Sequence, residues 1–154
     1  MLKLNKSPLL LLLPILLLNA CTNPPEGSFI GGSMKKTVKT KDGEEIMEFR
    51  PYTEEERLSF KKNGELKWSK VEKGKPLSSD GTWSMHRDHA GHNNVHATFK
   101  LRGHEITYIL GQRKNDLGQE EMHLKAVIKD GMEKAVNKDS PLVMSAFVKA
   151  QERN

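Results

Sequence analysis

Two hydrophobic patterns follow one another along this 154-residue chain. Residues 8–18 form a nearly continuous apolar run, rich in leucine and interrupted by Pro14. After residue 28, apolar and polar residues alternate with a period of two, and Asp-Gly or Asn-Gly pairs separate the alternating segments. This alternation indicates strands with one buried face, and such dipeptides are typical of hairpin turns. No helical period competes over a long window, so the sequence predicts an all-β domain.

The clearest hairpin surrounds the Asn-Gly pair that ends at Gly64. A two-residue loop would divide the apolar residues between the two faces. A three-residue loop, with Gly64 in the left-handed conformation, sets Phe60 opposite Leu66 and Leu58 opposite Trp68. The sequence therefore predicts the three-residue loop, because it keeps the apolar face continuous.

The same reasoning predicts a series of opposed pairs: Val38 with Ile46, Trp83 with Phe99, Met85 with Ala97, Phe99 with Ile106, and Ala97 with Tyr108. A final apolar stretch, residues 142–148, follows Pro141. These segments make eight or nine short strands joined mostly by tight antiparallel turns. Such a meander buries one face of every strand most simply by closing on itself. We predict an up-and-down antiparallel β-barrel over residues 29–154.

The first apolar run is predicted to be the helical core of a secretory signal peptide, residues 1–20. Basic residues precede it, no acid accompanies it, and it is shorter than the about 20 residues that a membrane span needs. It ends in Leu18-Asn19-Ala20-Cys21, which resembles the lipobox of bacterial lipoprotein precursors. This resemblance implies cleavage before Cys21 and lipid attachment to its sulfur. Residues 21–28 contain two prolines and a glycine, and we expect them to form a flexible tether.

Several acyl chains on one residue would hold the protein stably to a membrane. The residue after Cys21 is Thr22 and not aspartate, so the resemblance favours the outer membrane of the cell envelope if the source is Gram-negative. Removal of the signal peptide lowers the net charge from +5 to +3, and acidic and basic residues are interspersed. We therefore expect no nucleic-acid partner. Cys21 is the only cysteine, which excludes an internal disulfide.

The predicted inward faces are apolar or aromatic throughout: Leu58, Phe60, Leu66, Trp68, Trp83, Met85, Phe99, Leu101, Tyr108, Leu110, Met122 and Leu124. An eight-stranded barrel is just wide enough either to pack shut or to hold one small ligand. We favour a filled or nearly filled core, and both alternatives stay open. If a hydrophobic ligand binds inside, its expected contacts are Leu58, Phe60, Trp68, Trp83, Met85, Phe99, Tyr108 and Leu124.

A histidine cluster is the one chemically suggestive feature. It comprises His86, His89, His92 and His96. The pairing above sets His86 opposite His96 on the outer face, with the other two histidines in the loop between them. Imidazole nitrogens are ligands for Zn²⁺, Cu²⁺ and Ni²⁺. The spacing matches no strict zinc template, so a hydrated polar loop is the plainer alternative.

Several short segments together resemble the small lipocalin-like domains of bacterial lipoproteins. They are Phe29-Ile30-Gly31, Arg57-Leu58-Ser59-Phe60 followed by Asn63-Gly64, Gly81-Thr82-Trp83, and a Tyr-Ile-Leu strand. The resemblance implies a membrane-tethered barrel that binds a small hydrophobic ligand. The alternative is a protein-interaction module with a closed core, such as an inhibitor or an assembly factor.

Catalysis and a resident cofactor are not expected. No Gly-x-Ser-x-Gly, His-Glu-x-x-His, Walker or Rossmann pattern occurs in the sequence. The one cysteine is assigned to the lipid anchor, and Glu54-Glu55-Glu56 is interpreted as a solvated run. The predicted partners are the membrane, through acylated Cys21, and either a small hydrophobic ligand or an envelope protein.

Overall fold

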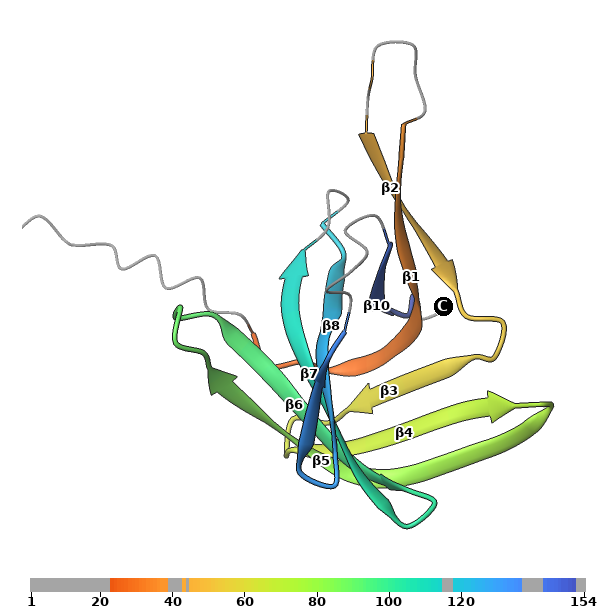
Figure 1. Cartoon of the computed structure of the whole chain (residues 1–154), viewed down its shortest axis with the longest axis vertical. Helices are drawn as coiled ribbons and strands as arrows, with labels where there is room; N and C mark the ends of the chain where they lie inside the picture. Colours follow the sequence, from red (N-terminus) through yellow and green to blue (C-terminus); the bar gives the residue numbers. More distant parts are fainter. Residues whose placement is uncertain (1–22, 39–42, 44, 115–117, 137–142, 152–154) are drawn as a thin grey trace, which may run out of the picture.

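Ten antiparallel strands and no helix make up the part of the chain that the computed structural model describes, residues 23–38, 43, 45–114, 118–136 and 143–151 (Figure 1). The strands are β1 (Gly27–Val38), β2 (Glu45–Pro51), β3 (Glu56–Phe60), β4 (Glu65–Glu72), β5 (Lys75–Arg87), β6 (Asn93–Leu101), β7 (His104–Lys114), β8 (Glu120–Lys129), β9 (Met132–Ala135) and β10 (Val143–Lys149). Within these ranges no helix is long and apolar enough to cross a bilayer. The predicted signal peptide, Cys21 and Pro141 lie outside the described residues.

Eight of these strands close into an antiparallel barrel, which confirms the predicted fold class at that level. From β3 to β8 each strand pairs with the next one along the chain. Strand β1 lies between β3 and β10, and β10 closes the barrel against β8. This last junction, called the seam below, joins only three residue pairs: Ala146–His123, Phe147–Met122 and Val148–Glu121. Strands β2 and β9 pair with β1 and β8 outside this circuit (Figure 1).

The β3–β4 hairpin has the predicted register. Phe60 lies opposite Leu66 and Leu58 opposite Trp68. Gly64 has a φ of 86°, a left-handed conformation that glycine adopts without steric cost. The β6–β7 hairpin also agrees with the prediction, because Phe99 pairs with Ile106 and Ala97 pairs with Tyr108.

The β5–β6 pairing differs from the prediction by two residues. Trp83 lies opposite Ala97, not Phe99, and Met85 lies opposite Val95 and not Ala97. The residue opposite Phe99 is Gly81. A two-residue shift leaves every side chain on its expected face, so the alternation could not distinguish the two registers.

The β1–β2 hairpin also differs from the prediction. Val38 lies opposite Glu45, while Ile46 pairs with Thr37. Strand β2 is outside the barrel circuit, so no shared interior selects one register over the other. Strand β1 begins at Gly27, inside the segment that the sequence predicted to be a tether, and Pro25 is already buried.

The middle of the barrel is packed with side chains. A cluster of apolar residues, each at most 3% exposed, draws on seven of the eight barrel strands: Phe29, Leu58, Phe60, Leu66, Trp68, Val95, Ala97, Phe99, Leu110, Met122 and Phe147. Trp68 stacks on Phe99 at 5.0 Å between ring centroids, and Phe99 meets Tyr108 edge-on at 5.1 Å. Side chains that lined a wide internal cavity would keep accessible surface, so this layer closes the centre of the barrel.

Candidate functional site

The two ends of the barrel differ. At the end where β1 begins and β10 ends, the segment before β1 packs against the barrel. Pro25 is buried there, and the side-chain nitrogen of Gln112 donates a hydrogen bond to the carbonyl of Asn23 at 3.2 Å. The opposite end, called the Glu56 mouth below, is bounded by three tight turns with left-handed residues: Lys73-Gly74, Arg102-Gly103 and Asp130-Gly131.

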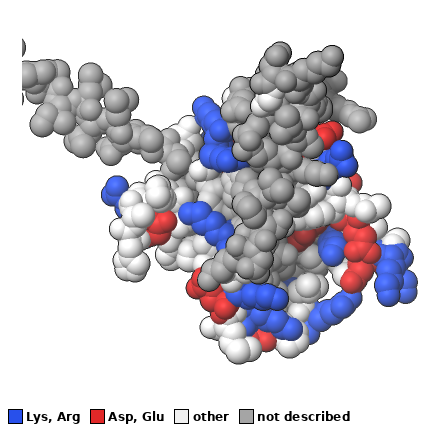
Figure 2. Space-filling view, turned by 45° about the horizontal axis from the view of Figure 1, so that its top comes forward, with Lys and Arg blue, Asp and Glu red and all other residues white. Residues whose placement is uncertain are grey.

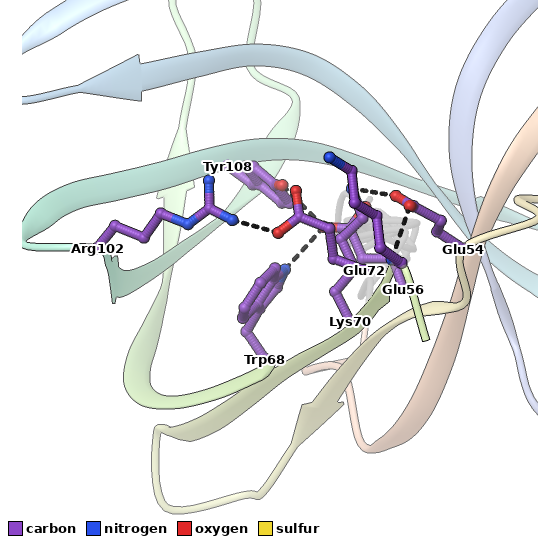
Figure 3. A network of polar contacts seen from close by, with 8 residues as sticks. Glu54, Glu56, Trp68, Lys70, Glu72, Arg102 and Tyr108 are labelled. Atoms are coloured by element: carbon purple, nitrogen blue, oxygen red, sulfur yellow. Dashed lines mark hydrogen bonds and ion pairs between the residues drawn. The ribbon is translucent and has the colours of Figure 1, made fainter. Parts of the chain in front are cut away.

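Glu56 gives this mouth its name because it is a buried carboxylate on the inner face. It is the first residue of β3 and shares that face with Leu58 and Phe60, in line with the period-two burial of the strand. Only 8% of Glu56 is exposed. Its Oε1 accepts hydrogen bonds from Trp68 Nε1 at 2.7 Å and from the Tyr108 hydroxyl at 2.8 Å. Figure 3 shows both donors directed at Glu56 from β4 and β7.

No cation of the described residues forms an ion pair with Glu56. Lys70 lies directly opposite Glu56 in the β3–β4 register, but its Nζ pairs with Glu54 Oε2 at 3.4 Å. Burial, followed by the negative charge of Glu56, raises the pKa of Tyr108, so this hydroxyl remains a donor at neutral pH. Glu56 is therefore held by two neutral donors, Trp68 and Tyr108, and by no cation of the described residues.

The rim of the mouth combines apolar and charged side chains. Leu77, Leu101 and Ile106 are partly buried and pack against the core cluster. Arg102 forms an ion pair with Glu72 (Figure 3). At the turn after β8, His104 Nδ1 lies 2.6 Å from Asp130 Oδ2. Apolar side chains, a charged rim and the buried carboxylate of Glu56 therefore meet at this end of the barrel.

The eight residues predicted to contact a ligand all belong to the core cluster or pack against it. Four are at most 2% exposed and four are partly exposed: Leu58, Phe60, Trp68 and Phe99 in the first group, and Trp83, Met85, Tyr108 and Leu124 in the second. Two of the eight lie at the Glu56 mouth, because Trp68 Nε1 and the Tyr108 hydroxyl donate hydrogen bonds to Glu56. Sequence reasoning missed Glu56 itself, although its position two residues before Leu58 in an alternating strand was a usable signal.

The two strand histidines of the predicted metal site lie together on the outer face. The rings of His86 and His96 stack with centroids 4.0 Å apart and planes 23° apart. The sequence predicted that these two residues would be directly opposed, and this was wrong. Asn94 is the partner of His86, and Ser84 is the partner of His96. Burial, and then the neighbouring charge of His86, lower the pKa of His96.

The two loop histidines do not complete a cluster with this pair. His89 and His92 are exposed, and His92 Nδ1 lies 3.5 Å from Asp88 Oδ2. Over the described ranges, no three His, Cys, Asp or Glu side chains gather closely enough to hold a metal ion. Two nearly parallel imidazole rings also direct their in-plane lone pairs along similar directions instead of toward one point.

The outer surface carries charges of both signs side by side. On the face shown in Figure 2, lysine and arginine side chains alternate with aspartate and glutamate side chains over the described residues. Two examples are the ion pairs of Lys61 with Glu65 at 2.6 Å and of Lys149 with Glu120 at 2.7 Å. Exposed pairs of this kind contribute little stability.

The fold and the site together define a closed antiparallel barrel with a packed centre and a carboxylate buried at one end. Comparison with protein-family models and with curated protein sequences found no match.

Proposed function

We propose that this chain is a lipid-anchored lipoprotein of the bacterial cell envelope, and that its lipocalin-like barrel binds a small, largely hydrophobic ligand at the Glu56 mouth. One observation carries the proposal: a buried carboxylate, which no cation of the described residues pairs with, stands beside partly exposed apolar side chains in a barrel with a packed apolar centre. Buried ionisable groups without a charged partner are concentrated at functional sites.

The packed centre limits how far a ligand can enter. Trp68 and Phe99 stack across the barrel and leave almost no exposed surface. The apolar part of a ligand would therefore rest on Leu101, Ile106 and Tyr108, which keep accessible surface. Trp83, another predicted contact, lies at the opposite end of the barrel, where its backbone nitrogen donates to the carbonyl of Gly64, and would not touch such a ligand.

Calorimetric titration of the mature chain with dodecanol tests ligand binding. The chain is produced without its signal peptide and with Cys21→Ser, and the alcohol is kept below its solubility limit. Binding at micromolar concentration is expected. Ile106→Trp should fill the mouth and weaken binding at least tenfold. Met132→Trp is the matched control, because Met132 is 75% exposed on β9, outside the barrel. Absent binding, or equal binding by the two variants, would contradict the proposal.

Metabolic labelling tests the anchor. A radioactive fatty acid should label the full-length protein in a bacterial host, and Cys21→Ser should abolish the labelling, because the sulfur is the attachment atom. Membrane fractionation should then place the wild-type protein in the envelope. Equal labelling of the two proteins would rule out Cys21 as the lipidated residue.

The packed centre also supports the second candidate, an interaction module that inhibits or assembles an envelope protein. A cleft of about 670 Å³ lies on β3, β4 and β5, lined by Ser59, Lys61, Glu65, Leu66, Lys67, Asp80 and Gly81. A photo-crosslinking residue in place of Lys67 should then capture one envelope protein, while the same residue in place of Met132 should not. Capture at neither position would remove the support for this candidate.

A further inference from the structure

The hydrogen bonds of Glu56 use only one of its two carboxylate oxygens. Trp68 and Tyr108 both donate to Oε1, and no donor among the described residues is paired with Oε2. An ionised carboxylate can accept about four hydrogen bonds. The side chain therefore has unused acceptor capacity at the floor of the mouth.

Glu56 is the one acid of its polar network without an ion pair among the described residues. Figure 3 labels three carboxylates, those of Glu54, Glu56 and Glu72, and two cationic side chains, Lys70 and Arg102. Both cations are paired with other acids: Lys70 with Glu54 at 3.4 Å, and Arg102 with Glu72. Lys73 also lies at this rim, where its backbone nitrogen donates to Glu54 Oε1 at 3.1 Å. Three cations thus accompany three acids, but Glu56, the most buried of these acids, forms no ion pair with any described residue.

The field of such a site distinguishes between ligand head groups. A buried carboxylate attracts positive charge and repels negative charge, and low-dielectric surroundings strengthen this effect. An ammonium group brings both a positive charge and three donors for the free acceptor sites. A fatty-acid carboxylate would instead add a second negative charge beside Glu56.

We infer that Glu56 makes the mouth selective for amphiphiles that carry a protonated amine. This inference rests on the proposed function and names its ligand class. The ammonium group binds at the carboxylate of Glu56, and the aliphatic chain lies along Leu101 and Ile106 at the rim. Trp68 and Tyr108 are positioning residues that hold the carboxylate in place.

A purely structural role for Glu56 makes a different prediction. In that case the carboxylate serves only to tie β3 to β4 and β7 through its two hydrogen bonds. The variant Glu56→Gln separates the two roles, because the amide oxygen still accepts from Trp68 and Tyr108 while the charge is removed. Glu55→Gln is the matched control, since it removes the charge of the neighbouring residue, which is 54% exposed and pairs with Arg57 and not with Lys70.

The experiment compares three probes with the same twelve-carbon chain: dodecylamine, dodecanol and dodecanoate. Each is titrated calorimetrically into the mature Cys21→Ser chain at pH 7 and below its critical micelle concentration. Dodecylamine should bind at least tenfold more tightly than dodecanol, and dodecanoate should bind most weakly. Glu56→Gln should abolish the preference for the amine and leave the affinity for dodecanol within about twofold, while Glu55→Gln should retain most of the preference.

Each outcome separates this inference from the proposed function. Equal binding of all three probes, or a preference for the amine that survives Glu56→Gln, would overturn the inference and leave the hydrophobic site standing. Absence of binding for every probe would overturn the proposed function as well. Thermal melts show whether Glu56→Gln is folded. If it is not, Glu56→Asp is used, which shortens the reach to an ammonium while keeping the charge and should reduce the preference.

Discussion

Replacing Gly81, the one glycine of β5 and β6, with alanine should disturb the packing of these two strands against each other. A Cβ at Gly81 would lie 2.1 Å from the carbonyl oxygen of Thr98 and 3.0 Å from Cβ of Phe99. A carbon and an oxygen that are not bonded normally stay more than about 3 Å apart. The two backbones would therefore have to separate by about 1 Å.

The cost can be worked out from what this separation disturbs. Gly81 is paired with Phe99, and the ring of Phe99 stacks on Trp68 at 5.0 Å. Overpacking of a tight site costs about 1–3 kcal/mol, and a disturbed aromatic pair adds about 0.5–1.5 kcal/mol. A loss of about 2–4 kcal/mol should lower the melting temperature by roughly 10 °C. This penalty is steric, because the φ of Gly81 is outside the left-handed region.

Gly111→Ala is the matched control for this prediction. A Cβ at Gly111 would lie 2.6 Å from Cε of Lys125, which is the far end of a flexible side chain and can rotate away. Both glycines are in barrel strands, and neither has a positive φ. Thermal melts followed by circular dichroism should show a much larger loss for Gly81→Ala. If the two variants melt together, the close approach of β5 to β6 is wrong.

Three further predictions concern a turn, an ion pair and the histidines. Gly64→Val should destabilise the protein by about 1–3 kcal/mol, because a β-branched residue is strained at a φ of 86°, and Gly64→Asn should cost less; equal melting temperatures would contradict this. The hydrogen bond from His104 lowers the pKa of Asp130, so the pair stabilises the protein above the ordinary carboxyl pKa and this contribution is lost as pH falls through the lowered value. In an NMR titration His104→Ala should therefore raise the pKa of Asp130, and an unchanged pKa would refute the assignment. If the histidines bind Zn²⁺, Cu²⁺ or Ni²⁺, titration at pH 7.5 should show micromolar binding that weakens at lower pH and disappears in the double variant His86→Ala with His96→Ala, whereas no binding would exclude the site.

Local pattern and turn chemistry were sufficient for much of the fold. The apolar alternation around Gly64 selected the correct hairpin register, since the alternative would have split the apolar face. The β5–β6 register was not predictable in this way, because it depends on the fit of Gly81 against Phe99, a contact between strands. Strand β9 was missed because its four residues are mostly exposed and do not alternate.

The candidate site was harder to predict because its members are far apart in the sequence. The donors to Glu56 lie 12 residues away, at Trp68, and 52 residues away, at Tyr108. Glu54, Glu55 and Glu56 are chemically identical, and only the start of β3 decides which of them faces inward. The alternation from Leu58 backwards was the available signal, but a run of three acids is more often solvated.

The seam has a consequence for the order in which the molecule folds. The hairpins from β3 to β8 join neighbouring segments, whereas β10 must meet β1, more than a hundred residues earlier in the chain. Because joining distant segments carries the larger entropic cost, the pairing of β10 with β1 should form last. The seam between β10 and β8 would then close the barrel in the same step. In a protein exported from its N-terminus as proposed, the interior would stay exposed until β10 had crossed the membrane, so its last strand would set the time for which chaperones must protect the chain.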